Sequence, residues 1–450
     1  MLKRIITLLL ALAMVFSMCA MAGCKDNGGN GGKPAVNSGS NQNEEEYFLD
    51  MPSELRGTTV KFATWIDHAK TDTAICLSGF EETTGMKYEL VQVNQSDYVV
   101  KMTALISADQ SPDVVVDVGN FPKTLNLLQP LSKETNGLDA TDPFWDQRTS
   151  ELFHIGNNYY LVNGANSSWL MMDGAMTYFH KTLLEENGIK TPADYVAENN
   201  WNTDTLWTLL TQVKSSCGLS NPPAEIAFDT WLNTYGGGQY KFNQETDKFE
   251  NAIQTTESKM AIDYLMRGKD AGLIKIISNH GDGITKAAHA VQFAGAYGLR
   301  KSPGWFYTMD VDDLGFAVPP KLNADDADYP YAGSTRAYGI CKGAKNAKGA
   351  AYFLRYFLNQ EHYDMDQMFK TEEAKEMYLK LREKGDINKV TWSDGVGRVT
   401  DPSYHELTFV QDLIDGTAAQ VGVNLASVSS KLDGAAAAAN KLLEDIIAAQ

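Results

Sequence analysis

Residues 59–118 alternate between strand and helix patterns, and this alternation restricts the chain to a small group of folds. Residues 60–65 alternate apolar and polar side chains as a strand does, and residues 88–93 form a second predicted strand. Residues 114–118 are a short apolar run, which is typical of a strand covered on both faces. Because helical patterns separate the three strands, we expect a parallel sheet covered by helices, and the fold class is α/β.

The two intervening helices have recognisable boundaries. Gly85 is placed to end the first helix, and Ser96 is placed to cap the second. A further helix is expected over residues 121–128. The positions at helical spacing are Thr73, Cys76, Leu77 and Phe80 in the first helix and Val99, Met102, Leu105 and Ile106 in the second.

The length of the chain predicts more than one folded unit, and its negative charge argues against a nucleic-acid partner. The chain has 450 residues, and because single cores stop growing at roughly 250–300 residues, we expect more than one folded unit. Apolar residues make up 43% and charged residues 21%, as in ordinary soluble proteins. Acidic residues number 57 against 39 Lys and Arg, for a formal net charge of -18. Nucleic-acid binding depends on basic residues, so we expect no nucleic-acid partner.

The first 23 residues have the pattern of a secretory signal. Lys3 and Arg4 precede an apolar stretch that runs to residue 22, and small residues then lead directly to Cys24. This ending resembles the lipobox of bacterial lipoproteins, which implies cleavage before Cys24 and acylation of its thiol, with palmitate as the expected acyl chain. The alternative is an ordinary signal with an incidental cysteine. We expect residues 1–23 to be a lipoprotein signal peptide.

Residues 24–46 are rich in Gly, Asn, Ser, Gln and Glu, and almost no apolar residue occurs among them. Such a segment cannot bury enough surface to order itself, so we expect a flexible linker. A lipid anchor followed by a linker places the protein at the cell membrane, on its extracellular face. Cys76, Cys217 and Cys341 follow at wide spacing, which is neither a disulfide framework nor a metal-ligand pattern.

Four blocks of sequence carry a resemblance to a known family. The blocks are residues 80–131, residues 158–162 with 176–181, residues 231–237, and residues 339–346 with the following helix to 358. Taken in order, they resemble the family 1 extracellular solute-binding proteins, the group of the maltose-binding protein. In the second block, Phe179 and His180 replace the pair that is usual in the family.

The resemblance implies a two-lobed, periplasmic-binding-protein-like fold with three hinge crossings and a ligand between the lobes. Lobe one is then residues 47–165 plus 337–392, and lobe two is residues 166–336 plus 393–450. The residue pattern agrees independently at one point. The first and third predicted strands direct their following loops to the same edge of the sheet, where open α/β sheets bind ligands.

Candidate ligand contacts follow these strands. Sugars present hydroxyl groups and apolar faces, so their sites combine polar side chains with aromatic rings. Trp65 and Asp67 follow the first strand, and Asp117 and Asn120 follow the third. Packing between the lobes is the alternative role for Trp65. Asp117 has the alternative role of capping the helix at residue 121.

Further candidates lie in the crossings and in lobe two. The resemblance places Asn166 and Trp169 in the first crossing and Arg336 in the second, where Arg336 either binds ligand or bridges the lobes. Phe228 and Tyr297 are the candidates of lobe two. Tyr297 aligns with a ring-stacking aromatic residue of the family, although Trp305 competes with it. We expect Trp231 to be a core residue.

No motif indicates catalysis, a metal or a cofactor. The acidic segments at residues 310–313 and 323–328 lack the spacing of a calcium loop, and Leu314 stands where an oxygen ligand is needed. The sequence contains neither a nucleophile-elbow motif nor a phosphate-binding loop. We therefore expect no cofactor and no metal, and we expect that the protein is not an enzyme.

The resulting hypothesis is a lipid-anchored, monomeric solute-binding protein of an ABC importer. It would capture a mono- or oligosaccharide by hinge closure and deliver it to the transmembrane subunits of an ABC permease. One alternative is a surface glycoside hydrolase or lyase, since 57 acidic residues always offer a pair of carboxylates. Another is a sensory or adhesive binding lipoprotein without a transport role.

Replacing Cys24 with Ala tests the anchor. Without the thiol there is no acylation, so the Cys24→Ala protein should be released into the medium or should remain unprocessed. Fractionation and mass spectrometry of the amino terminus measure both. A Cys24→Ala protein that stays in the membrane fraction with normal processing would contradict the lipoprotein hypothesis.

Overall fold

The computed structural model describes residues 44–71, 73–170, 174–278, 284–286, 288–301, 309–333, 335–387, 392–405 and 407–450. The predicted signal peptide, Cys24, Trp305 and most of the predicted linker lie outside these residues. The first described element, α2 (Glu44–Leu49), begins inside the predicted linker, which was expected to end at residue 46. All described residues belong to one compact unit.

The first sheet has four strands in the order β13-β3-β1-β2. Its members are β1 (Thr59–Thr64), β2 (Lys87–Gln92), β3 (Val114–Val116) and β13 (Tyr338–Ile340). β1 pairs in parallel with both β2 and β3, which confirms the predicted parallel arrangement, and β13 is antiparallel to β3. β3 is buried throughout, as a strand covered on both faces should be.

The predicted end of α3 is confirmed, and the predicted start of α4 is wrong by one residue. α3 (Ala74–Thr84) ends at Gly85, whose φ of 67° is the left-handed conformation that glycine adopts readily. α4 (Tyr98–Ser107) begins after Asp97, so the predicted cap at Ser96 is wrong by one residue. The Tyr98 hydroxyl donates to the Ala63 carbonyl over 2.9 Å, and this buried bond ties the start of α4 to β1.

The helix expected over residues 121–128 is instead a short 3-10 helix, η4 (Lys123–Leu127). Its backbone bonds join residues three apart, from Leu125 to Pro122 and from Leu128 to Leu125. The segment ends after five residues and does not continue as an α-helix. α11 (Ala347–Phe357) packs on β1 beside α3 and is capped by the Asn346 side chain.

The second sheet has five strands in the order β10-β7-β11-β6-β12. Its members are β6 (Ala175–His180), β7 (Ala224–Ala227), β10 (Ile274–Ile277), β11 (Val291–Gly295) and β12 (Leu314–Ala317). β7 is parallel to β10 and β11, while β6 is antiparallel to β11 and β12. Its associated helices are α6 (Lys181–Glu186), α7 (Pro192–Ala197), α8 (Thr203–Ser216), α9 (Phe228–Tyr235) and α10 (Thr256–Asp270).

Trp231 lies in the core beside this second sheet, as expected from the sequence. Its side chain is fully buried, and its indole nitrogen donates to the Ala261 carbonyl over 3.1 Å. The Tyr264 ring stacks on it at 5.3 Å, and Phe293 of β11 meets it edge-on. Each of these contacts fills the space between α9, α10 and the sheet.

Two chain segments run side by side between the sheets. Val162 and Tyr338 exchange two backbone hydrogen bonds of 2.8 and 2.9 Å, and Leu170 forms a bridge with Thr335. Further along, the Ala175 amide donates to the Ala332 carbonyl over 3.0 Å, directly at the start of β6. The pairing is antiparallel, so each segment restrains the other.

A third segment leaves α11 and joins the second sheet. It contains η6 (Gln360–His362), α12 (Met365–Met368) and α13 (Glu372–Lys384). The Lys370 amide donates to the Leu299 carbonyl, and the Lys301 amide donates to the Met368 carbonyl. These bonds hold the segment after α11 against the residues that follow β11, and the lobe boundaries remain a prediction.

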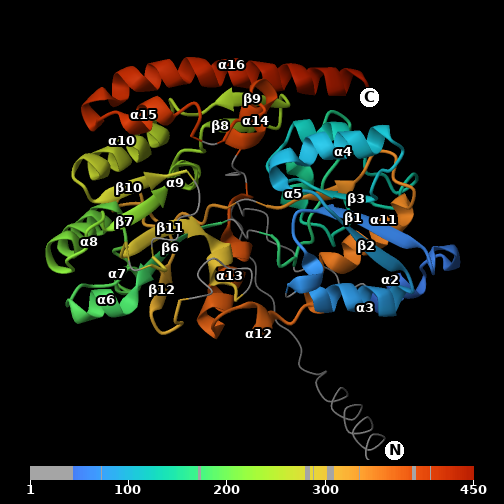
Figure 1. Cartoon of the computed structure of the whole chain (residues 1–450), viewed down its shortest axis with the longest axis horizontal. Coiled ribbons are helices and arrows are strands. Elements are labelled where there is room, and N and C mark those ends of the chain that lie inside the picture. Colours follow the sequence, from blue (N-terminus) through green and yellow to red (C-terminus); the bar gives the residue numbers. More distant parts are fainter. Residues whose placement is uncertain are drawn as a thin grey trace, which may run out of the picture. The chain divides into compact units, whose positions relative to one another are not determined.

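The last part of the chain contains α14 (Ser393–Thr400), α15 (Gln411–Asp415) and α16 (Val421–Ala448). α16 packs along α14 and along the hairpin of β8 (Tyr240–Asn243) and β9 (Lys248–Asn251) (Figure 1). Beyond α16, Gln450 bonds to the carbonyl of Ile155 in the small hairpin of β4 (His154–Ile155) and β5 (Asn158–Tyr159), which α5 (Gln147–Leu152) precedes. Within the described residues, no helix combines the length and apolarity needed to cross a membrane.

The role of α2 yields a stability prediction. Phe48 is 5% exposed and packs edge-on against Tyr356 of α11, with ring centres 5.5 Å apart. Phe48→Ala should therefore lower the free energy of unfolding by about 3–5 kcal/mol, as loss of a buried aromatic ring does. Chemical denaturation of the purified protein measures this loss.

Leu49 supplies the matched control, since it lies in the same helix and is 75% exposed. Leu49→Ala should change the unfolding free energy by no more than about 0.5 kcal/mol. Equal, small effects of both substitutions would show that α2 is not part of the folded core.

Candidate functional site

Trp65 and Asp67 lie in the loop after β1, as predicted. Both side chains are partly exposed. The Asp67 carboxylate pairs with the Lys70 ammonium over 2.6 Å, and the lysine side chain is 83% exposed. Exposed ion pairs contribute little to stability, so Asp67 can exchange this partner for another at small cost.

Trp65 begins a stack of alternating rings and guanidinium groups. The Arg336 guanidinium lies 4.6 Å from the centre of the Trp65 ring and 5.9 Å from that of Trp169. The Arg300 guanidinium lies 4.8 Å from the Trp169 ring. We call Trp65, Arg336, Trp169 and Arg300 the tryptophan–arginine stack. Cations over indole faces are attracted by the ring quadrupole, most strongly when water is excluded.

The inner members of the stack are shielded from water. Trp169 is 3% exposed and Arg300 is 1% exposed. The His68 ring meets Trp169 edge-on at 5.6 Å, and the Phe357 ring lies nearly parallel to it at 6.5 Å. With these groups around it, Trp169 is a buried side chain in this structure, and its role as a ligand contact stays a prediction.

The pKa of His68 is affected by burial and by the two arginines of the stack. Burial, together with the positive charges of Arg336 and Arg300, lowers the pKa of His68 to about 3. Its two ring nitrogens face the hydroxyl oxygens of Thr73 and Thr64 at 2.9 and 3.3 Å. His68 is therefore neutral at physiological pH, and it braces the loop that carries Trp65.

Asp117 and Asn120 follow β3, as predicted, and they organise the loop that leads to η4. The Asp117 carboxylate accepts from the Asn120 amide over 3.2 Å and from the Thr124 hydroxyl over 2.5 Å. Burial raises the pKa of Asp117. The Asn120 side-chain oxygen accepts from Arg398 of α14 over 3.1 Å, and Arg398 also pairs with Asp394. Asp117 does not cap a helix at residue 121, because η4 begins at Lys123 after Pro122 and has no side-chain cap, and its role as a ligand contact stays a prediction.

Asn166 lies in the first crossing and binds the third chain segment. Its side-chain amide donates to the Asn359 side-chain oxygen over 3.0 Å, and its backbone carbonyl accepts from Arg382 of α13 over 2.7 Å. The Tyr378 hydroxyl, also from α13, donates to the Leu170 carbonyl over 2.7 Å. These bonds hold α13 against the first crossing.

The two candidates of the second lobe differ in burial. Phe228 is fully buried at the start of α9. Tyr297 is partly exposed in η5 (Ala296–Leu299), three residues before Arg300 of the stack. η5 therefore ends beside the stack, and the role of Tyr297 as a ligand contact stays a prediction.

The structure thus brings together Trp65, Trp169 and Arg336 from three separate parts of the chain. Sequence reasoning missed Arg300 and His68. Arg300 follows the candidate Tyr297 by one helical turn, and His68 directly follows Asp67, so proximity in sequence was the available indication. Asp117 and Asn120 instead bond to Thr124 and Arg398, and Asn166 bonds to Asn359.

A buried carboxyl group lies beside α14. Asp229 of α9 accepts from the Gln239 side chain over 2.7 Å and from the Ser393 hydroxyl. Burial, with the negative charge of Asp394 nearby, raises the pKa of Asp229 to about 7. Asp229 is therefore about half protonated at neutral pH. Its hydrogen bond with Ser393 ties α9 to the start of α14.

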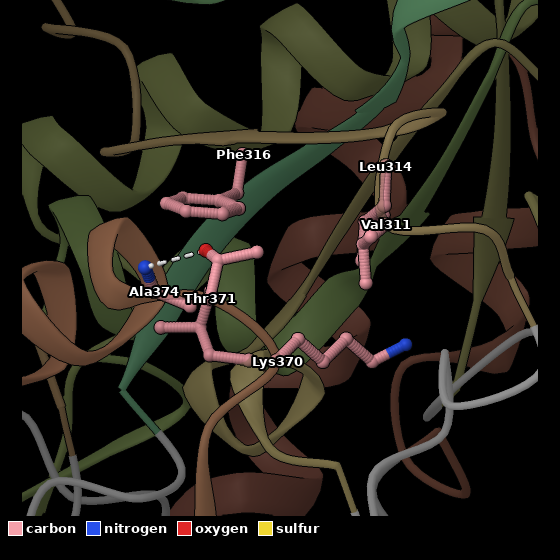
Figure 2. A pocket seen from close by; sticks show the side chains of 7 residues that line it. Val311, Leu314, Phe316, Lys370, Thr371 and Ala374 are labelled. Carbon is pink, nitrogen blue, oxygen red and sulfur yellow. Dashed lines mark hydrogen bonds between the residues drawn. The ribbon is translucent and has the colours of Figure 1, made fainter. Parts of the chain in front are cut away.

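A small apolar pocket lies between β12 and the start of α13 (Figure 2). Its cavity volume is about 10 Å³, room for roughly one water molecule. A sugar ring does not fit. Burial lowers the pKa of Lys370 in its wall to about 8. The lining residues are Leu299, Val311, Leu314, Phe316, Lys370, Thr371 and Ala374.

The described residues contain no group of three or more His, Cys, Asp or Glu side chains arranged to hold a metal ion. Cys76, Cys217 and Cys341 are free thiols. Burial raises the pKa of Cys76 and of Cys341 to about 12, so neither is a reactive thiolate at neutral pH.

Comparison with solved structures identifies the fold. The cyclic alpha-maltosyl-1,6-maltose binding protein of Arthrobacter globiformis matches with a TM-score of 0.61 and 16% identity, over 86% of this chain and 100% of that one. The GacH receptor of Streptomyces glaucescens matches with a TM-score of 0.57 and 16% identity, over 86% and 99%. The extracellular solute-binding protein of Staphylococcus aureus in complex with maltose matches with a TM-score of 0.54 and 10% identity, over 87% and 99%.

No protein-family model and no curated protein matches the sequence. A further match, with a TM-score of 0.52 and 15% identity, is the ABC substrate-binding protein Lmo0181 of Listeria monocytogenes in complex with cycloalternan, over 86% of this chain and 99% of that one. At these identities the likeness shows the fold, which is periplasmic-binding-protein-like and α/β with two mixed sheets. The fold class predicted from the sequence is confirmed to that extent, and the number of hinge crossings stays a prediction.

The raised pKa of Asp229 predicts a pH dependence of stability. Between the unfolded value of 3.8 and about 7, the folded state binds more protons than the unfolded state. The free energy of unfolding therefore falls as pH rises through this window. Asn cannot ionise, so Asp229→Asn should gain up to roughly 4 kcal/mol relative to wild type between pH 4 and pH 8.

Denaturation curves at several pH values measure this difference. Glu376→Gln is the matched control, because Glu376 is exposed, and its curve should run parallel to that of wild type. A parallel curve for Asp229→Asn as well would show that Asp229 is ionised at acidic pH in the folded protein.

Proposed function

We propose that this protein is an extracellular, carbohydrate-binding solute-binding protein of an ABC importer. The single observation that carries the proposal is the fold, which matches sugar-binding proteins over 86% of the chain. The tryptophan–arginine stack supports it, since a partly exposed indole lies where segments from both sheets meet. The ligand class is a mono- or oligosaccharide, held between lobe one and lobe two.

Capture follows from a difference in affinity between two states. A ligand that contacts both lobes does so only when they are closed, so it shifts an open–closed equilibrium by its extra contacts in the closed state. The paired crossings, joined at Val162 and Tyr338, are short and antiparallel, which suits them to bend without separating. The closed form would be the one that the transmembrane subunits of the permease recognise.

The contacts proposed for the sugar combine one apolar platform with polar side chains. Trp65 is the proposed platform, and Asp67 beside it is the proposed acceptor of sugar hydroxyls. Tyr297 is the proposed contact from the second lobe. Arg336 bridges Trp65 and Trp169, which corresponds to the lobe-bridging alternative from the sequence.

The location belongs to the same proposal. Residues 1–23 act as the signal peptide, Cys24 carries the lipid, and the following linker holds the binding protein on the outer face of the cell membrane. The protein acts as a monomer without a cofactor or a metal.

A thermal-shift screen of a protein that starts at residue 39 tests this function. We expect one class of mono- or oligosaccharide to raise the melting temperature, because a ligand that binds only the folded state stabilises it by mass action. At a ligand concentration 100 times Kd the gain is about 2.7 kcal/mol. Amino acids, peptides and polyamines in the same screen should have no effect.

Two outcomes would contradict the proposal. Stabilisation by a solute that is not a carbohydrate would show that the ligand class is wrong. Release of new reducing ends from a polysaccharide would show a hydrolase, because a binding protein makes no product. Small-angle scattering with and without the stabilising sugar then measures closure, which should reduce the radius of gyration.

A further inference from the structure

The tryptophan–arginine stack connects both sheets through both paired crossings. Trp65 follows β1 of the first sheet, and Arg300 follows η5 beside the second. Trp169 and Arg336 lie between them, one in each of the paired segments. Each neighbour in the series is within 6 Å, as the distances of 4.6, 5.9 and 4.8 Å show. The stack is therefore a continuous series of contacts across the hinge region.

Backbone and side-chain hydrogen bonds fix the centre of this stack. The Asn163 side chain donates to the Arg336 carbonyl over 2.7 Å, and the Ala337 carbonyl accepts from the Asp117 amide over 2.8 Å. The Trp169 amide donates to the Ser167 hydroxyl over 3.1 Å. These bonds hold Arg336 and Trp169 by their backbones, and the Arg336 guanidinium lies over both the Trp65 and the Trp169 rings.

The outer end of the stack differs from the inner end in exposure. Trp169 and Arg300 are buried, whereas Trp65 is partly exposed. One face of the Trp65 ring is covered by a guanidinium held at 4.6 Å. An aromatic ring that is fixed before its ligand arrives loses less conformational entropy on binding, and affinity rises accordingly.

We propose that Arg336 is a positioning residue that fixes the Trp65 ring as the stacking platform for the sugar, acting through the ring rather than on the ligand. This inference rests on the proposed carbohydrate-binding function. It also assigns the buried Trp169 a supporting role, in which its ring holds the Arg336 guanidinium from the other side.

A double-mutant cycle tests this role. Arg336→Ala and Trp65→Ala should each weaken binding of the sugar found in the screen by about tenfold or more. If Arg336 acts through the ring, the double variant should bind no more weakly than Trp65→Ala alone. Arg336→Lys keeps the charge but lacks the planar guanidinium, so it should restore only part of the affinity. Titration calorimetry measures the sugar affinity of wild type and of all four variants.

The matched control is another arginine over a tryptophan, far from the stack in the sequence. The Arg267 guanidinium lies 5.7 Å from the centre of the Trp207 ring, on α10 and α8. Arg267→Ala should leave sugar affinity unchanged. Melting temperatures of all variants are compared, so that unfolding is not mistaken for loss of binding.

Near-ultraviolet circular dichroism gives a readout that needs no ligand. A fixed indole in an asymmetric environment has a resolved spectrum, and a mobile one does not. The difference spectrum of wild type minus Arg336→Ala should therefore resemble that of wild type minus Trp65→Ala. If no sugar binds wild type, the proposed function fails, while this spectrum still decides whether Arg336 fixes the ring.

Three results would overturn the inference. Fold-losses that multiply in the double variant would place Arg336 on the ligand itself. Unchanged affinity in Arg336→Ala would remove any role in binding. An unchanged indole spectrum in Arg336→Ala would show that the ring is held by other contacts.

Discussion

The antiparallel pairing of the two crossings is the constraint on which the rest of the structure depends. Val162 and Tyr338 exchange two backbone hydrogen bonds, and Leu170 forms a separate bridge with Thr335. Trp169 lies between the two contacts on one segment, and Arg336 lies between them on the other. The two contacts therefore keep these side chains close enough for the stack to form.

Polar side chains supply hydrogen bonds between the three chain segments that meet here. Asn163 reaches from one crossing to the backbone of the other, and Tyr378 and Arg382 bind the first crossing from α13. Buried backbone groups need partners, and the three segments supply them for one another without a regular sheet. The region therefore keeps its backbone hydrogen bonds while remaining narrow enough to bend.

The α/β class and the first three strands could be predicted because local periodicity determines them. The cap of α4 and the shape of residues 121–128 could not, since they depend on Tyr98 reaching β1 and on Pro122 beginning a short turn. The burial of Trp169 depends on Arg300, which lies 131 residues away in the sequence, and no local pattern connects them. Contacts between distant segments are what sequence periodicity leaves out.

α16 has a mechanical consequence. A helix of 28 residues extends over about 42 Å at 1.5 Å per residue, and it runs from α15 and α10 to the chain end at Gln450. Gln450 bonds to Ile155 and Tyr160 beside the first sheet, over 3.1 Å in each case. α16 also contacts η4 along its length. If the sheets rotate as proposed above, a rod of this length would turn a small rotation into a larger displacement at its far end, where the Gln450 side chain makes its bonds.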